Sequence, residues 1–331
     1  ETPASPARRR RYTRGRGASR PCPRVCFVPL DKELTPVATA FVRARNADPM
    51  CSFGDFIAVS GTVDECTANL IKAEVSDGIV AAGYTKEALD ILTTKKNGNY
   101  IILRGKPINS EPNNKSNVEI REMHGVVLVQ EENKKMTNMS SFNNVVCGKI
   151  PDKSKLDLII GNTTLKYTQS NSVCAVKDGQ VIGVGAGQQS RVDCVKLVKR
   201  KAINWFLRRH PKVIKLHGLF VKGVRRTDKV NAIVQYIEND MTDETTKMVE
   251  VVPDRLTDDD KAKYIGGLNG VALASDAMFP FTDNIYVAKQ FGTEFIIQPG
   301  GSVADDDIVR ACSELGISMA ITGPEMRMFL H

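Results

Sequence analysis

The strongest constraint on the fold lies near the C-terminal end of the sequence. Phe295–Ile297 and Ile317–Ile321 are apolar runs short enough to be buried strands. The stretch between them opens with Ser302–Asp305, which suits a helix cap, continues with apolar residues at helical spacing, and closes at Gly316. A strand, a helix and a strand at this spacing form a right-handed crossover within a largely parallel sheet. The sequence therefore predicts an α/β fold.

A second ordered segment lies in the middle of the chain. Residues 173–184 hold two β-type runs around Asp178–Gly179, a dipeptide that accepts the positive φ angles of a tight hairpin turn. Residues 192–206 carry a helical pattern. The sequence thus predicts a hairpin followed directly by a helix.

The N-terminal half is expected to form a separate lobe. Thr62–Glu65 is a capping box and predicts a helix of about four turns that ends near Asp77–Gly78, before a strand at Ile79–Val80. Residues 107–156 are polar, with one expected strand at Gly125–Val129, and form the expected lobe boundary. The predicted divisions are an arginine-rich arm (1–24), a first lobe (25–150) and a second lobe with a connecting region (151–331).

The positive charge is concentrated at one end of the chain. The net charge is +8, and residues 1–24 contain eight arginines against a single acidic residue, Glu1. The remainder is therefore close to neutral, which argues against a polyanion-binding surface on the body of the protein. RNA binding by the arm is the weakest of the functional hypotheses.

Cysteine usage and hydropathy favour a cytosolic protein without a metal. No apolar run approaches the roughly 20 residues of a membrane span, and no secretory signal is recognisable. Eight cysteines are scattered along the chain, so free thiols are expected. Cys22 and Cys26 lack the spacing of a zinc knuckle, and four histidines give poor support to a histidine-rich metal site.

The segment Gly185–Arg191 is the most informative candidate for ligand binding. It leaves a predicted strand and enters a predicted helix, so its backbone amides, the helix start and Arg191 could hold an anion such as a phosphate, while Ser190 caps the helix. Glycines before a helix also occur for purely steric reasons. From these residues alone, the steric and phosphate-binding interpretations are equally favoured.

Two further polar clusters accompany this segment. Lys166–Ser172 is rich in hydrogen-bonding groups, although such a stretch is usually a solvated loop. Ser275–Asn284 combines aromatic residues and a proline with carboxylates, which suits a flat heterocyclic ligand. For Phe279 and Phe281, a place in the core is the favoured alternative.

Taken together, these segments resemble the AICAR transformylase domain of the PurH family of bifunctional purine-synthesis enzymes. The resemblance covers about residues 25–331. It is carried by Ser52–Phe56, Glu74–Gly78, Lys166–Ser172, Gly185–Arg191, Ser275–Asn284, Gln298–Ser302 and Arg327–His331.

The resemblance implies a fold, a reaction and partners. The expected fold is a pair of duplicated cytidine-deaminase-like α/β lobes without zinc, working as an intertwined homodimer with active sites at the subunit interface. The expected reaction moves a formyl group from 10-formyltetrahydrofolate to the 5-amino group of AICAR, giving FAICAR and tetrahydrofolate in the cytosol. No metal, nucleic acid or membrane is expected to take part.

The same resemblance assigns roles to individual residues of this sequence. Asn171 would orient the carboxamide and formyl oxygens, Arg191 would hold the phosphate, and Asp283 would reach the pterin. The implied catalytic residues are Asn171, Asp283 and His331. The implied AICAR contacts are Gly54, Asp77, Gly187, Arg191 and Arg327. The implied folate contacts are Met50, Phe53, Pro280, Phe281 and Asn284.

The N-terminal end departs from the family pattern. The family carries a Lys-Tyr-Gly stretch and a Lys-His pair for proton transfer, and neither occurs here; Thr2 and Pro3 stand roughly where the pair belongs. A frame-shifted coding segment would account for the arginines of residues 8–24, and the chain is expected to be a fragment without the cyclohydrolase half. The alternative function is therefore a non-catalytic AICAR- or folate-binding remnant.

Overall fold

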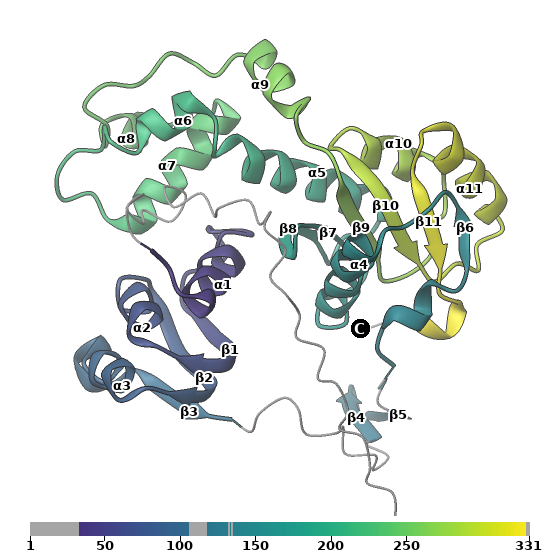
Figure 1. The fold of residues 1–331 in the computed structure, drawn as a ribbon, viewed down its shortest axis with the longest axis horizontal. Coiled ribbons are helices and arrows are strands. Elements are labelled where there is room, and N and C mark those ends of the chain that lie inside the picture. The colour runs from purple at the N-terminus through teal and green to yellow at the C-terminus, as the bar shows by residue number, and fades with distance from the viewer. Residues whose placement is uncertain (1–32, 106–117, 132, 134, 329–331) are drawn as a thin grey trace, which may run out of the picture.

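Figure 1 shows the computed structural model, which describes residues 33–105, 118–131, 133 and 135–328. The strands form three sheets: one of three strands, one of six and a separate two-stranded hairpin. Among the described residues no helix is long and apolar enough to cross a membrane. The mixture of parallel and mixed sheets with covering helices confirms the predicted α/β class.

The three-stranded sheet contains β1 (Asp55–Val63), β2 (Ser76–Tyr84) and β3 (Ile101–Arg104) in that spatial order, all parallel. Helices α1 (Pro36–Arg45), α2 (Glu65–Lys72) and α3 (Lys86–Leu92) accompany it. One apolar cluster joins these helices to the strands, because the strand–helix–strand connections bring the apolar face of each element to the sheet. Its buried members include Phe41, Ile57, Ile71, Ile79 and Tyr100.

The capping-box prediction for this region was partly wrong. Helix α2 begins one residue after Asp64, whose carboxylate accepts a hydrogen bond from the Thr67 amide at 2.8 Å, so Asp64 and not Thr62 is the N-cap. The helix ends at Lys72, well short of the four turns expected. Asp77–Gly78 lies inside β2, where the expected strand at Ile79–Val80 is confirmed.

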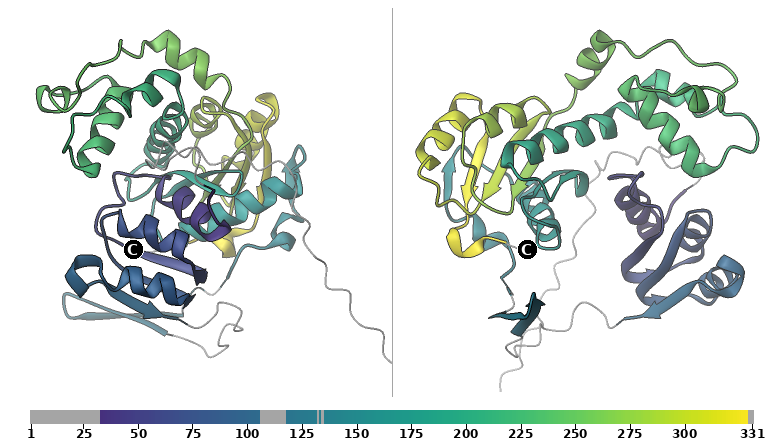
Figure 2. Two further views of the ribbon diagram at one scale, coloured as in Figure 1. Left: turned by 60° about the vertical axis from the view of Figure 1, so that its left-hand side comes forward. Right: turned by 180° about the vertical axis from the view of Figure 1, so that it is seen from behind.

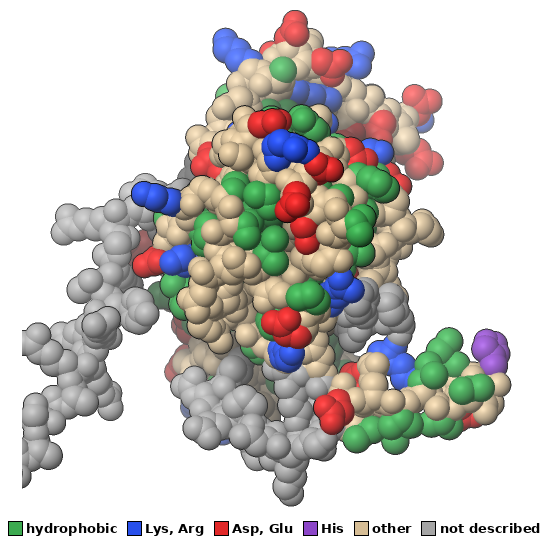
Figure 3. Space-filling view, turned by 90° about the vertical axis from the view of Figure 1, so that its right-hand side faces the viewer, with side chains coloured by type: hydrophobic (Ala, Val, Ile, Leu, Met, Phe, Trp, Pro, Cys, Tyr) green, Lys and Arg blue, Asp and Glu red, His purple; other side chains and the backbone are tan. Residues whose placement is uncertain are grey.

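The region between the two larger sheets holds more strands than the single one expected. Strands β4 (Val118–Met123) and β5 (Val126–Glu131) form an antiparallel hairpin, and β6 (Val145–Cys147) follows. Apolar and polar residues alternate at the start of β4, which is a strand signal, but the polar composition of the surrounding region favoured a loop. Figure 3 shows the hairpin as a projection from the body with hydrophobic side chains on its surface.

The six-stranded sheet has the order β6-β11-β10-β9-β7-β8. Its centre is parallel, and the remaining pairings are antiparallel. The strands after β6 are β7 (Val173–Lys177), β8 (Gln180–Gly185), β9 (Val271–Ser275), β10 (Thr293–Gln298) and β11 (Ser318–Ile321).

Helices cover both faces of this sheet (Figures 1 and 2). Helix α4 (Asp152–Leu165) packs on one face, where Leu158 joins a cluster with Ala272 and Ala274 of β9. Helices α5 (Arg191–Leu207), α10 (Asp283–Lys289) and α11 (Asp305–Glu314) share the other cluster with alternate residues of the same strands. The sheet is therefore buried on both sides.

A helical region connects α5 to β9. It contains α6 (Pro211–Leu216), α7 (Arg226–Glu238), α8 (Asp243–Thr246) and α9 (Asp258–Ile265), built around a cluster of its own. Short 3₁₀ helices complete the described chain at Lys95–Gly98, Met139–Phe142 and Pro324–Met326.

The predicted hairpin and the C-terminal strand–helix–strand unit are both confirmed. Asp178 and Gly179 have φ angles of 52° and 74° in the turn between β7 and β8, and α5 follows as expected. Strands β10 and β11 are parallel, with α11 between them. The N-terminal cap of α11 differs from the prediction, since Ser302 does not cap the helix. Instead, the carboxylate of Asp305 accepts hydrogen bonds from the amides of Gly301 and Ser302.

Candidate active site

A cleft of about 480 Å³ lies where three segments of the region that carries the six-stranded sheet converge. One segment precedes and enters α5, the second joins β9 to α10, and the third follows β11. This cleft brings together seven of the predicted site residues, which are Asn171, Arg191, Pro280, Phe281, Asp283, Asn284 and Arg327.

Asn171 and Arg191 are held against each other on one side of the cleft. The Arg191 Nη2 donates a hydrogen bond to Asn171 Oδ1 at 2.9 Å, and Asn171 Nδ2 donates to the carbonyls of Gln188 and Gln189 at 3.1 and 3.2 Å. The guanidinium also forms an ion pair with Asp276, and both side chains are almost fully buried. Arg191 therefore faces Asp276 and Asn171 in this structure, and its predicted contact with a phosphate remains a prediction.

The glycine segment before α5 serves two purposes. A Cβ at Gly185 would lie 2.3 Å from the Cys194 carbonyl oxygen, so this glycine is required for close packing of β8 on α5. Gly187 has a φ of 68°, and its amide donates to the Gln169 carbonyl at 2.8 Å. Ser190 caps α5 as predicted, accepting a hydrogen bond from the Asp193 amide. The steric interpretation holds for Gly185, whereas Gly187 shapes the loop beside the cleft.

The opposite side of the cleft is formed by the start of α10. Asn284 is fully buried and donates hydrogen bonds to the Phe281 carbonyl at 2.9 Å and to Asp283 Oδ1 at 2.8 Å. Phe281 is 69% exposed, while Phe279 is completely buried. Phe279 therefore belongs to the core, whereas Phe281 presents an exposed aromatic ring at the cleft.

Arg327 closes the third side. Its Nη2 donates hydrogen bonds to the carbonyls of Gly300 and Gly301 at 3.3 and 3.4 Å. Its Nε is buried and has no hydrogen-bond partner in the described structure, and the same holds for Asn284 Oδ1. Both residues line the cleft, where polar side chains converge beside the exposed ring of Phe281.

Four predicted site residues lie elsewhere, at the start of the three-stranded sheet. Gly54 has a φ of 76°, and a Cβ there would lie 3.6 Å from Asp77 Oδ2, so these two residues are neighbours. Asp77 forms an ion pair with Lys96, and Met50 and Phe53 stand in the loop before β1. None of these residues lines the cleft beside Arg191. His331, Thr2, Pro3, Cys22 and Cys26 lie outside the described residues.

Sequence reasoning missed Asp276, although it lies inside a segment that was recognised. Nothing in the local sequence distinguishes its carboxylate from the exposed Asp283, because its burial arises from the convergence of β9, α5 and the chain after β11. Cys194 lies beside the same group, with its thiol 3.1 Å from the Asn171 carbonyl oxygen, and burial raises the pKa of that thiol.

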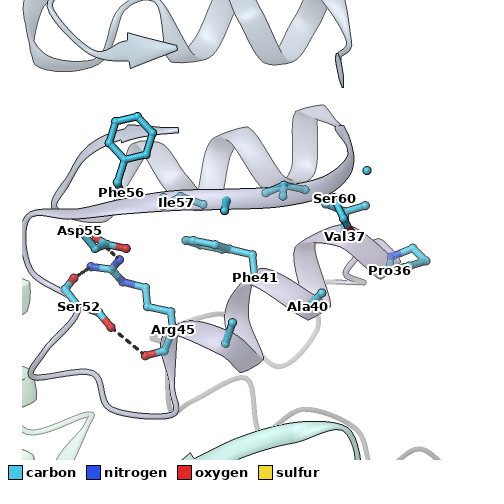
Figure 4. A pocket seen from close by; sticks show the side chains of 14 residues that line it. Pro36, Val37, Ala40, Phe41, Arg45, Ser52, Asp55, Phe56, Ile57 and Ser60 are labelled. Carbon is cyan, nitrogen blue, oxygen red and sulfur yellow. Dashed lines mark hydrogen bonds and ion pairs between the residues drawn. The ribbon is translucent and has the colours of Figure 1, made fainter. Parts of the chain in front are cut away.

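A second pocket, of about 520 Å³, lies between α1 and β1 (Figure 4). Its lining is mainly apolar, and Phe41 and Phe56 point to opposite sides of β1. Arg45 binds Asp55 at 2.9 Å at one end, so the principal charges there are already paired. This pocket offers fewer groups for chemistry than the cleft in the second lobe.

Among the described residues no group of three or more His, Cys, Asp or Glu side chains could hold a metal ion.

Comparison with known proteins identifies the family. The AICARFT/IMPCHase bienzyme family model matches residues 25–201, more than half of the chain. This chain belongs to the AICARFT/IMPCHase bienzyme family. The resemblance expected from the sequence motifs is thereby confirmed.

Individual members of the AICARFT/IMPCHase family align over most of the chain. The bifunctional purine biosynthesis protein PurH of Acetivibrio thermocellus is 32% identical over 293 residues, which cover 88% of this chain and 44% of that protein. The proteins of the same name from Roseobacter denitrificans and from a Ruegeria species are each 30% identical, with the same coverage. The chain thus spans less than half the length of the curated relatives it matches.

Proposed function

We propose that this chain transfers a formyl group from 10-formyltetrahydrofolate to AICAR, giving FAICAR in purine biosynthesis. The observation that carries the proposal is the cleft in which Asn171 and Arg191 face Asp283 and Asn284. Membership of the AICARFT/IMPCHase family supports the choice of substrates.

The properties of the cleft suit the folate co-substrate. A pterin is a flat ring that carries both hydrogen-bond donors and acceptors. The exposed carboxylate of Asp283 lines the cleft and can accept hydrogen bonds from the donors of such a ring. The exposed ring of Phe281 offers an aromatic surface for stacking.

The proposed chemistry joins an amine to a carbonyl carbon. The 5-amino nitrogen of AICAR attacks the formyl carbon, and a tetrahedral oxyanion forms. When the oxyanion collapses, the bond from the formyl carbon to N10 of the folate breaks, N10 takes up a proton and the amine loses one. An aromatic amine is a poor nucleophile, so the site must assist proton transfer and stabilise the oxyanion. We assign the orientation of the formyl oxygen to Asn171.

The remaining assignments extend the same proposal. Pro280, Phe281, Asp283 and Asn284 would bind the folate, Arg327 would bind AICAR, and His331 would join the site from the C-terminal end. Arg191 and Gly187 would complete the AICAR site on the other side. Met50, Phe53, Gly54 and Asp77 would contribute from the first lobe.

An interface between two copies of the chain would reconcile the two groups of residues. The first-lobe residues do not line the cleft of their own chain. In an intertwined homodimer they could face the cleft of the partner subunit. We extend the proposal to such a homodimer in the cytosol, and to a duplicated cytidine-deaminase-like fold for the two lobes.

The test is the AICAR-dependent formation of tetrahydrofolate from 10-formyltetrahydrofolate by the purified chain. We expect turnover that is at least about a hundredfold slower than in a domain with the family's Lys-His pair, from the size of a lost acid–base group. Asn171→Ala should lower the remaining rate by a further factor of about 10 to 100. A chain that neither binds AICAR nor forms tetrahydrofolate in its presence would contradict the proposal.

A further inference from the structure

Asp276 lies at the carboxyl end of β9, beneath the cleft and outside its lining. The residue is fully buried, and its two carboxylate oxygens take different donors. Oδ1 accepts from Arg191 Nη1, and Oδ2 accepts from the hydroxyl of Ser170. Its backbone carbonyl accepts from the Met328 amide at 3.0 Å. Asp276 therefore joins the three segments that form the cleft, although it does not line the cleft itself.

Arg191 links Asp276 to the side chain of Asn171. Its Nη1 also donates to the Ser172 carbonyl at 2.9 Å, while Nη2 donates to Asn171 Oδ1 at 2.9 Å. The guanidinium is planar and rigid, so fixing Nη1 also fixes the direction of Nη2. With both Nδ2 hydrogens of Asn171 given to loop carbonyls, the carboxamide has one orientation and one free lone pair on Oδ1.

The charge of Asp276 is needed to keep the guanidinium in place. The side chain of Arg191 is 5% exposed and that of Asp276 is 1% exposed, so neither charge is compensated by water. Without the carboxylate, the buried guanidinium would have to turn toward solvent in the cleft. It would then release Asn171 Oδ1.

We propose that Asp276 is a positioning residue, which acts through Arg191 to fix the carboxamide of Asn171 for catalysis. This inference rests on the proposed function, because it assigns a purpose to the orientation of Asn171. The geometric part of the claim concerns the ligand-free chain and can be tested on its own.

The first test measures the Asn171 side chain directly. In the full chain labelled with ¹⁵N-asparagine, Asp276→Asn should speed hydrogen exchange of the Asn171 side-chain amide by about tenfold or more. The matched control is Asp157→Asn, since Asp157 is a buried carboxylate in the same lobe that accepts from the Asp178 and Gly179 amides at 3.0 and 2.6 Å. Unchanged exchange in Asp276→Asn, or an equal increase in the control, would overturn the proposal.

The second test is a double-mutant cycle on formyl transfer. Asp276→Asn should lower kcat by about tenfold with little change in KM, because it misplaces a group that acts in the transition state. Added to Asn171→Ala, the same substitution should have no further effect on kcat. Additive losses would overturn the proposal. If the wild-type chain shows no AICAR-dependent turnover, the proposed function fails, while the exchange measurement still decides the positioning role.

Discussion

At the scale of single residues, burial determines which side chains stabilise the fold and which are accessible to a ligand. Asp276 and Asp283 stand seven positions apart in the same segment, yet the first is buried against Arg191 and the second lines the cleft. Phe279 and Phe281 divide in the same way. Each pair consists of identical residue types, so only the three-dimensional surroundings separate their roles.

His210 makes stability sensitive to pH at this scale. Its Nδ1 accepts from the Lys212 amide at the start of α6, its ring packs against Tyr264, and burial lowers its pKa below 6.5. The unfolded chain therefore takes up this proton more readily than the folded one. The stability contribution of the neutral ring is present above about pH 6.5 and is lost as pH falls through the lowered pKa.

His210→Asn tests this prediction, because asparagine can cap α6 without titrating in this range. Urea unfolding measured from pH 7.5 to about 5.5 should show a smaller loss of stability in the variant than in the wild type. An equal loss in both proteins would show that other groups cause the pH dependence.

At the scale of elements, turn chemistry determines the β7–β8 hairpin on which the cleft depends. Gly179 has a positive φ, and a Cβ there would meet nothing within 4 Å, so Gly179→Ala introduces backbone strain without a clash. We expect a loss of about 1 kcal/mol in the free energy of unfolding, measured with urea.

Gly125 provides a matched control for this substitution. It has a φ of 77° and equally open surroundings, and it follows a residue of positive φ, as Gly179 does. Its hairpin, β4–β5, contributes to no core cluster of the described residues. Gly125→Ala should therefore change global stability less than Gly179→Ala, and a larger effect at Gly125 would contradict this account.

The same elements illustrate what could be predicted from the sequence. The β7–β8 hairpin, α5 and the β10–α11–β11 unit carry local signals, namely a turn dipeptide, helical spacing and short apolar runs. Helix α2 was predicted too long because Ala73 continues the helical spacing and the stop signal was placed at Asp77–Gly78, whereas the helix ends at Lys72. Strand β4 was missed because it lies in a region of polar composition that resembles a loop. Neither boundary depends on local sequence alone.

The site was predictable only in part, for a related reason. The motifs around Asn171, Arg191 and Asp283 were recognised in the sequence, and the fold brings them to one cleft. The ion pair of Arg191 with Asp276 joins residues 85 positions apart, so it cannot be predicted from local sequence patterns. The placement of Gly54 and Asp77 away from the cleft is likewise a property of the tertiary fold.

At the scale of the whole molecule, a charged network ties the three-stranded sheet to the helical region. Glu74 is 10% exposed, and its carboxylate contacts Arg45 at 3.2 Å and Arg226 of α7 at 2.6 Å. Glu74→Gln would leave the buried guanidinium of Arg45 with less compensation. We expect the free energy of unfolding, measured with urea, to fall by about 2 kcal/mol. Removing one partner of a largely buried ion pair leaves the other charge uncompensated, and this penalty is larger than the net stabilisation that the intact pair provides.

The control for Glu74→Gln is Arg310→Gln, which removes an exposed ion pair with Asp307 within α11. Such surface pairs contribute less than about 1 kcal/mol. A loss in Glu74→Gln no larger than that in Arg310→Gln would contradict a structural role for the network.

The central claim concerns where the two substrates meet. A crystal structure of the chain with AICAR and a stable folate analogue tests it most directly. We predict both ligands in the cleft between Asn171 and Asp283, with the folate analogue hydrogen-bonded to the carboxylate of Asp283. Ligands bound elsewhere, without contact to Asn171 or Asp283, would contradict this prediction.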